Sequence, residues 1–264
     1  SRYTDDGLIV PGSSYGRRIG QARPGLNQLS GVVTRLRTDP GTRRAATVIW
    51  SPEDAVRDSN DIPCAFGTFY HMRDGGLTAT TVMRSNNAFL LLPFNIFEFS
   101  LLAEMVAAEV GAELRQYVHW AASMHVLNRE FPQAERLLND EVSVSLAMPR
   151  MPSAHSPLAQ GRELAALEAE LRMARSVADI AKVRAASAEK LDPYWGSMLD
   201  VLATHHLSQM SEFGPAFEIV SQLPDHFRPG VSAVIERTQA AAGSAVPEQS
   251  SLFDEFLSES TQPA

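Results

Sequence analysis

The sequence is poor in cysteine, in long apolar runs and in positive charge. Cys64 is the only cysteine among 264 residues, which excludes an internal disulfide and any zinc site built from paired cysteines. No stretch approaches the roughly 20 apolar residues of a bilayer span, and the first residues do not have the pattern of a signal peptide. A net charge of -8 gives no general support for nucleic-acid binding. We therefore expect a protein of the reducing cytoplasm with no membrane segment.

What the sequence does contain is ordinary for a globular protein. Hydrophobic residues make up 44% and charged residues 20%, so wholesale disorder and fibrous folds are excluded. The length allows one large domain, or one domain with an appendage, around a well-buried core.

The first half of the chain alternates strand and helix patterns. The first thirty residues read as an irregular segment, and helical spacing of apolar residues predicts a helix over 26–37. Strands are expected over 45–50, 64–72 and 77–84, with residues 73–76 as a hairpin turn. A helix over 96–110 is apolar nearly all round, which predicts that it is buried. Residues 118–126 are expected to form another inner strand.

The composition changes near residue 150, where prolines punctuate a link. Beyond it, residues rich in Ala, Glu, Leu and Arg predict one or two helices over 158–191, and further helices over 193–210 and 215–223. We expect an α+β core over 1–152, a helical appendage over 153–239 and a flexible tail over 240–264.

Residues able to carry chemistry recur through the first half of the chain: Cys64, Arg84, Asn95, His125, and the pair Arg43 and Arg44. A nearby arginine stabilises a cysteine thiolate, which is the nucleophilic form. Several arginines and a serine suit a phosphate monoester, and a buried Asn offers the donor and acceptor needed to read a pyrimidine edge. Purely structural roles are also open: Asn95 can cap a helix, and Arg43 and Arg44 can be solvated turn residues.

These residues lie in motifs that resemble thymidylate synthase and its relatives, the pyrimidine-nucleotide hydroxymethylases. The matching motifs are Tyr15-Gly16, Asp39-Pro40-Gly41-Thr42-Arg43-Arg44, Pro63-Cys64, Arg73-Asp74-Gly75, Arg84-Ser85-Asn86-Asn87, Leu92-Pro93-Phe94-Asn95-Ile96 and His125. The spacings from Cys64 to Arg84, from Arg84 to Asn95 and from Asn95 to His125 are also similar. The resemblance implies a mixed β-sheet core packed by helices, and it covers a little under half of the chain.

The resemblance also implies a role for each matched residue. Cys64 would add to C6 of the pyrimidine, while Arg84 would hold the phosphate and activate the thiol. Ser85 would contact the phosphate, Asn95 would read O4 and N3 of the base, and His125 would touch the sugar. Tyr15 would line the pocket. In a homodimer, Arg43 and Arg44 would reach across the interface to the partner's phosphate.

Departures from the family pattern concentrate on the side that binds folate. Asn87 stands where the family has an aspartate that helps hold the pterin, and Leu91 replaces a glycine that lets the folate approach. Leu127 replaces a tyrosine that shares the sugar contact with His125, and Ser123 and Met124 replace another usual pair. The family's glutamate that organises water and its closing C-terminal segment are not recognisable.

The leading hypothesis is a transferase that moves a one-carbon unit from 5,10-methylenetetrahydrofolate to C5 of a pyrimidine nucleoside monophosphate. Hydroxymethylation is favoured over methylation, because it requires only that water reach the intermediate. One alternative is a non-enzymatic nucleotide-binding or interaction protein, and another is C5 chemistry that does not use folate. The base, uracil or cytosine, and the sugar stay open.

Two further patterns lie near the end of the chain. Gln249 to Phe253 resembles the short peptide with which bacterial proteins bind the DNA sliding clamp. The histidines His205, His206 and His226 have no cysteine or carboxylate at ligand spacing, so no metal site is expected there.

Overall fold

The structure is a computed structural model that describes residues 14–20, 24–139 and 146–243. These residues fall into two compact units, with the division between Val142 and Ser143. The expected domain boundary after residue 152 lies inside the second unit. The part resembling the sliding-clamp peptide, Gln249 to Phe253, lies outside the described residues.

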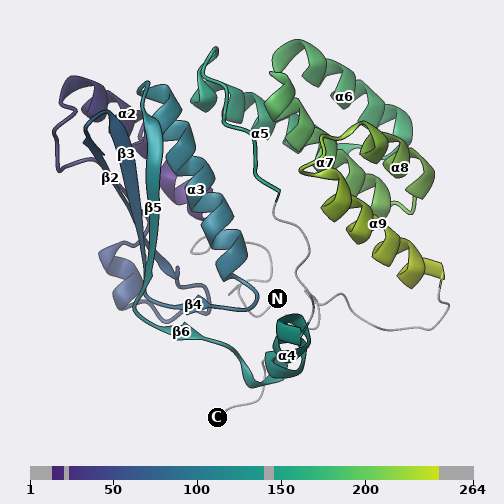
Figure 1. The fold of residues 1–264 in the computed structure, drawn as a ribbon, viewed down its shortest axis with the longest axis horizontal. Coiled ribbons are helices and arrows are strands. Elements are labelled where there is room, and N and C mark those ends of the chain that lie inside the picture. Colours follow the sequence, from purple (N-terminus) through teal and green to yellow (C-terminus); the bar gives the residue numbers. More distant parts are fainter. Residues whose placement is uncertain (1–13, 21–23, 140–145, 244–264) are drawn as a thin grey trace. The chain divides into compact units, whose positions relative to one another are not determined.

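The first unit is an α+β structure (Figure 1). In chain order its elements are α1 (Tyr15–Gly20), α2 (Gln28–Thr38), β1 (Ala46–Val48), η1 (Pro52–Ala55), β2 (Ala65–Arg73), β3 (Gly76–Met83), β4 (Asn86–Asn87), α3 (Leu92–Glu109), β5 (Glu113–Ala121), β6 (Met124–His125), η2 (Asn128–Glu130) and α4 (Phe131–Asn139). The fold class expected from the sequence is therefore confirmed, although α1 lies in a segment that was expected to be irregular.

The sheet is mixed, with the strand order β1-β2-β3-β5. β1, β2 and β3 pair antiparallel, whereas β3 and β5 run parallel. The turn between β2 and β3 places Asp74 at φ 48° and Gly75 at φ 75°, the left-handed pair that a tight hairpin requires. The predicted hairpin is confirmed, and its register pairs Ala65 with Met83 at its open end.

The expectation of another inner strand over 118–126 was wrong. The strand β5 ends at Ala121 and is the last in the described sheet, and the next residues form β6, which pairs with β4. The strand is amphipathic: Tyr117 and His119 lie on the face that packs against α3, and Trp120 on the other face is 54% exposed. Continuous apolar character therefore did not mean burial on both faces.

The helix α3 begins earlier and is less buried than its sequence predicted. Pro93 lies in its first turn, where a proline is compatible with a helix. Phe99, Ala103 and Val106 are buried against the sheet, but Phe94 and Phe97 in the first turns are 65% and 50% exposed.

A small core cluster supports the end of the sheet at which the hairpin opens. Its buried members are Ile19, Ile49, Ala65, Met83 and Phe99, with Tyr15, Leu29, Cys64, Leu102, Tyr117 and Ala121 packed against them. Because α1, β2, β3, α3 and the residue that follows β1 each contribute to it, this cluster packs Cys64 against several elements.

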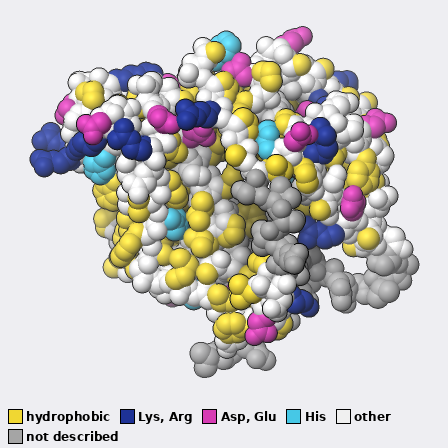
Figure 2. Space-filling model, in the orientation of Figure 1, with side chains coloured by type: hydrophobic (Ala, Val, Ile, Leu, Met, Phe, Trp, Pro, Cys, Tyr) yellow, Lys and Arg dark blue, Asp and Glu magenta, His cyan; other side chains and the backbone are white. Residues whose placement is uncertain are grey.

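The sheet face opposite α3 carries exposed apolar side chains. Figure 2 shows hydrophobic side chains gathered over the sheet, and those exposed on the described strands include Val48, Phe66, Phe69 and Trp120. Phe66 stacks on Trp50, with ring centroids 4.7 Å apart. An apolar face of this kind on a folded unit is typical of an interaction surface.

The second unit is helical. Its elements are α5 (Pro157–Met173), α6 (Val177–Lys190), α7 (Pro193–Gln209), α8 (Phe213–Gln222) and α9 (Arg228–Gly243). Ser156 and Ser176 cap α5 and α6 through their side chains. α9 continues to Gly243, past Ala240 where the tail was expected to begin, because an alanine-rich run favours helix. No helix in the described part of the chain has the length and hydropathy of a membrane span.

Candidate active site

Cys64 lies immediately before β2, at the open end of the hairpin. Its backbone carbonyl accepts a hydrogen bond of 2.8 Å from the N–H of Arg84, which immediately follows β3. The thiol is partly buried, and this burial raises its pKa above the ordinary value of 9.0, while the positive charge of Arg84 lowers it. Arg84 therefore acts in the predicted direction, but burial is the larger effect.

The Arg84 side chain folds back over the segment that precedes Cys64. Its Nε donates to the carbonyl of Pro63 (3.0 Å) and an Nη donates to that of Ile62 (3.1 Å). These bonds hold the guanidinium beside the thiol, at an exposed position where an anion can approach.

The hydroxyl of Tyr15 faces the same backbone from the other side. It accepts hydrogen bonds from the N–H groups of Cys64 and Ala65, both 3.3 Å long, and the ring stacks on Phe99. Burial raises the pKa of Tyr15 to about 12, so the hydroxyl is neutral at physiological pH. Because its oxygen accepts both bonds, its own proton remains available for donation.

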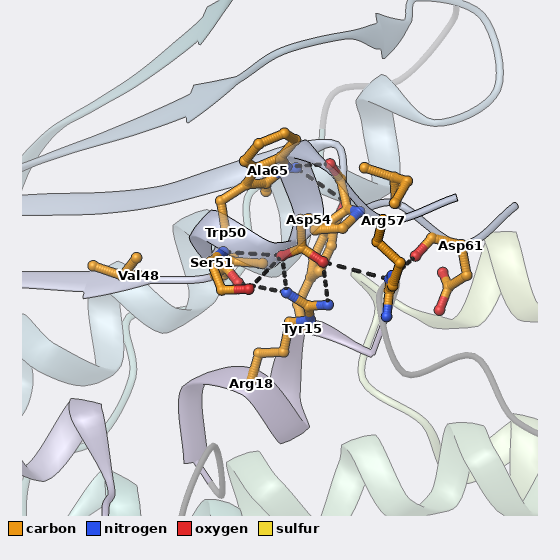
Figure 3. A network of polar contacts seen from close by, with 12 residues as sticks. Tyr15, Arg18, Val48, Trp50, Ser51, Asp54, Arg57, Asp61 and Ala65 are labelled. Atoms are coloured by element: carbon orange, nitrogen blue, oxygen red, sulfur yellow. Dashed lines mark hydrogen bonds and ion pairs between the residues drawn. The ribbon is translucent and has the colours of Figure 1, made fainter. Parts of the chain in front are cut away.

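A buried ion pair fixes α1, which carries Tyr15, under this backbone (Figure 3). The Arg18 guanidinium donates to both carboxylate oxygens of Asp54 (2.5 and 2.9 Å) and to the carbonyl of Ile49 (2.9 Å). Asp54 also accepts from the N–H of Ser51 (2.9 Å), and Arg57 lies 3.4 Å from it. The bond to Arg18 is the main cause that lowers the pKa of Asp54 to about 2.

Ser85 and His125 are brought together by the short pairing of β4 with β6. The serine Oγ lies 3.3 Å from Nδ1 of His125, which is exposed. The backbone bonds from Asn86 to Ser123 (2.9 Å) and from Ala88 to His125 (2.8 Å) hold the two strands in register. Two residues that are forty positions apart therefore lie side by side, and their contacts with a substrate stay a prediction.

Asn95 lies in the first turn of α3 and is tied to groups that the sequence analysis did not single out. Its Nδ2 donates to Oδ1 of Asn86 (3.1 Å), and Nδ2 of Asn86 lies 2.8 Å from Nε2 of His119. Nδ1 of His119 lies 2.8 Å from the hydroxyl of Tyr117, and burial lowers the pKa of the histidine. The alternation of polar inward residues on β5 was the only sequence signal for these partners.

Glu98 is another group that the motifs did not reveal. It follows Asn95 by one turn of α3, and burial raises its pKa. Its charge in turn contributes to raising the pKa values of both Tyr15 and Tyr117.

The two positions assigned to folate contacts do not fit that role. Asn87 is 3% exposed, and its Nδ2 donates to both carboxylate oxygens of Glu130 (2.9 and 2.8 Å). Its Oδ1 accepts from the N–H groups of Phe89 and Leu90, so the amide is fully used inside the protein. Leu91 is the N-cap residue of α3 and adds an apolar side chain where the family's glycine adds none. Neither position offers a polar contact to a pterin.

Arg43 and Arg44 are exposed in the segment before β1, and their side chains form no hydrogen bond or ion pair with residues of the described chain. Their action across a dimer interface stays a prediction. No three His, Cys, Asp or Glu side chains among the described residues lie close enough together to hold a metal ion.

The ion pair generates a prediction about stability. The pKa of Asp54 is lowered in the folded state. Its contribution to the free energy of unfolding is therefore fully present at pH values above 3.8, the ordinary pKa of the group, and is lost as the pH falls towards about 2. We expect Asp54→Asn to lower the free energy of unfolding by at least about 2 kcal/mol at pH 7, measured by urea unfolding, and the difference to shrink below pH 4. Asp225→Asn, at an exposed ion pair, is the control and should cost under about 0.5 kcal/mol.

The thiol generates a second prediction. We expect the rate at which iodoacetamide alkylates Cys64 to keep rising beyond pH 9, because burial disfavours the thiolate. Arg84→Gln should move the midpoint of this pH dependence, which is the pKa of the thiol, to still higher pH. Arg73→Gln, at the far end of the hairpin, should not move it. Intact-mass spectrometry reads the product directly, since the chain has one cysteine. A midpoint below the ordinary thiol value in the parent chain would contradict the assignment.

Comparison with known proteins places this arrangement in a family. A family model for thymidylate synthase matches residues 7–159, which is more than half of the chain and includes Tyr15, Cys64, Arg84 and His125. Thermostable thymidylate synthase A from Bacillus subtilis is 28% identical, over 53% of this chain and 51% of that chain, with a TM-score of 0.45. The chain thus spans about half the length of that protein. The resemblance drawn from the motifs is confirmed: the chain belongs to the thymidylate synthase family.

Proposed function

We propose that this protein transfers a one-carbon unit to C5 of a pyrimidine nucleoside monophosphate through an adduct of Cys64 at C6. The observation that carries the proposal is the position of Cys64, paired through its backbone with Arg84 and facing the hydroxyl of Tyr15. Family membership supports the reaction class. A thiol between a cation and a neutral donor suits attack on an anionic, hydrogen-bonding substrate.

In the first step, Sγ of Cys64 bonds to C6, and the electron pair of the C5–C6 double bond moves towards C5 and O4. Asn95 would hydrogen-bond the developing charge at O4, which is worth more in the transition state than in the ground state. Arg84 and Ser85 would hold the phosphate, and His125, bonded to Ser85, would contact the sugar. After the one-carbon unit has joined C5, loss of the C5 proton would expel the carrier of that unit and leave a methylene at C5. Addition of water to this methylene would return the double bond to C5–C6 and expel the thiolate of Cys64.

Proton transfer at this site is assigned to Glu98. Burial raises the pKa of its carboxyl, which brings it closer to neutral pH, where a group can both take and return a proton. Tyr15, whose pKa of about 12 keeps it protonated, serves as a donor rather than as a base.

The donor that the family implies is 5,10-methylenetetrahydrofolate, which supplies the one-carbon unit and, for a methyl product, the reducing hydride. Asn87 is committed to Glu130, and Leu91 offers no polar contact, so these residues do not hold the pterin. This misfit favours hydroxymethylation, because that product needs water at the C5 methylene rather than a hydride delivered in a dry, closed site. The misfit is also the observation that favours the second candidate, C5 chemistry without folate.

We further propose a homodimer in which Arg43 and Arg44 bind the phosphate held by the partner subunit. The exposed apolar face of the sheet, with Phe69 and Trp120, supports an extensive contact between two copies. The exposure of both arginines on the single chain is consistent with action outside it.

The test of the proposed chemistry is an adduct measurement. We expect 5-fluoro-deoxyuridylate with methylenetetrahydrofolate to give a covalent complex containing all three components, read by intact-mass spectrometry. Cys64→Ser should form none, yet bind the nucleotide within about tenfold of the parent chain, because serine is nearly isosteric and a much poorer nucleophile. Turnover with each of the uracil and cytosine monophosphates should yield a 5-hydroxymethyl nucleotide by chromatography.

Each other outcome identifies a different function. A nucleotide adduct that forms without folate supports folate-independent C5 chemistry. Binding with neither adduct nor product supports a non-enzymatic nucleotide-binding protein. A 5-methyl product formed in step with dihydrofolate would contradict the preference for hydroxymethylation.

The dimer is tested by complementation. Cys64→Ser and Arg44→Ala chains, each inactive alone, should recover part of the activity when they form mixed dimers, because one of the two sites then has both residues intact. Two Cys64→Ser chains mixed under the same conditions are the control. A monomer by light scattering, or verified mixed dimers without activity, would overturn the assignment of these arginines.

A further inference from the structure

Four polar side chains, from α3, β4 and the sheet strand β5, form a continuous hydrogen-bonded line. Nδ2 of Asn95 contacts Oδ1 of Asn86 (3.1 Å), and Nδ2 of Asn86 contacts Nε2 of His119 (2.8 Å). Nδ1 of His119 then contacts the hydroxyl of Tyr117 (2.8 Å). We call Asn86, His119 and Tyr117 the relay, and Asn95 is the group that it holds.

The relay has a direction. A carboxamide nitrogen can only donate and its oxygen can only accept, so with the amides as they stand His119 accepts at Nε2. The neutral ring then carries its proton on Nδ1 and donates it to Tyr117. If every donor and acceptor along the line is exchanged, all the hydrogen bonds can still form. This exchange requires the other tautomer of His119 and a half-turn of both the Asn86 and the Asn95 amides.

The far end of the relay is anchored in the core. Tyr117 lies near Thr81, which influences the pKa of its hydroxyl, and Oγ1 of Thr81 lies 2.9 Å from Oγ1 of Thr68. Both threonines are almost completely buried, at 0% and 1% exposed. Burial also keeps His119 neutral by lowering its pKa, and a neutral ring is required for a line that both accepts and donates. Asn86, within the line, is 2% exposed, so the line resists reversal: one unmatched bond would leave this buried amide without a partner.

The two pyrimidine bases differ in the pattern that Asn95 would read. Uracil presents an acceptor at O4 and a donor at N3, whereas cytosine presents a donor at N4 and an acceptor at N3. A carboxamide facing this edge matches one base in one orientation and the other base after a half-turn. An amide that turns freely would therefore accept both bases, and a fixed amide would accept one.

We propose that the relay of Asn86, His119 and Tyr117 fixes the orientation of the Asn95 amide and thereby makes the pocket selective for one of the two pyrimidine bases. This inference rests on the proposed function, in which Asn95 faces the base. The three relay residues are positioning residues, since they act through Asn95 and do not touch the substrate.

The experiment measures base selectivity by titration calorimetry of the full chain with uridylate, deoxyuridylate, cytidylate and deoxycytidylate. The readout is the ratio of the two Kd values for bases on the same sugar. We expect this ratio to differ from one by at least about tenfold in the parent chain, because the wrong base leaves buried polar groups unpaired. Asn86→Leu and His119→Phe should bring it within about threefold of one.

Asn86→Asp separates positioning from general damage. A carboxylate still accepts from Nδ2 of Asn95, and His119 can donate to it by changing its tautomer, so we expect the parent's selectivity to within about threefold. Tyr117→Phe removes only the hydroxyl at the anchored end and should reduce the selectivity by at least about threefold. If Asn86→Leu and His119→Phe do not fold, Tyr117→Phe alone tests whether the relay controls base selectivity. His205→Phe, on the exposed face of α7 in the second unit, is the control and should leave the ratio unchanged.

The outcomes distinguish this inference from the proposed function. A parent chain that binds both bases equally would overturn the relay's role. So would folded Asn86→Leu and Tyr117→Phe variants that keep the parent ratio, or an Asn86→Asp variant that loses selectivity as Asn86→Leu does. A chain that binds none of the four nucleotides would overturn the proposed function itself, and this result appears as an absence of heat rather than as a changed ratio.

Discussion

The site depends on the register of one hairpin. The turn at Asp74 and Gly75 sets which residues of β2 and β3 face each other, and the pairing runs from this turn to the open end. There the backbone of Arg84 donates to that of Cys64. A cation is thus fixed beside a thiol by main-chain geometry, and a slip of one residue would turn every side chain of a strand to the other face.

The packing around Cys64 has two opposite effects on the thiol: it fixes its position and it lowers its reactivity. Packing against the core cluster fixes the thiol, yet the same burial raises its pKa and reduces the thiolate fraction. Arg84 opposes this effect without cancelling it. The ion pair of Arg18 with Asp54 keeps α1, and with it Tyr15, against the backbone of Cys64. A substrate that brings a phosphate to the site also excludes water from it, so reactivity is expected to depend on the bound nucleotide.

The contact between Asn87 and Glu130 distinguishes the positions assigned to folate from those assigned to the nucleotide. In place of an acid exposed to a cofactor, the chain has an amide whose donors and acceptor are all used within the fold. The residues assigned to the nucleotide do not show this change: Arg84 and His125 remain exposed, and Asn95 is only partly buried. This difference agrees with the proposal that the protein binds the nucleotide as its family does and differs from the family at the positions assigned to folate.

By itself the sequence determined the hairpin, most of the helices and the family, because these depend on local turns, periodicity and motifs; the site formed by Cys64, Arg84, Ser85, Asn95 and His125 stays a prediction. Only the tertiary structure decided that β5 lies at the edge of the described sheet and that α3 is exposed at its start. It also decided the bonds of Asn86 to His119, Asn87 to Glu130 and Arg18 to Asp54, whose partners are 33, 43 and 36 positions apart. No local pattern joins the two residues of each pair, and only the packing of separate elements brings them into a buried environment where an unpaired polar group is costly.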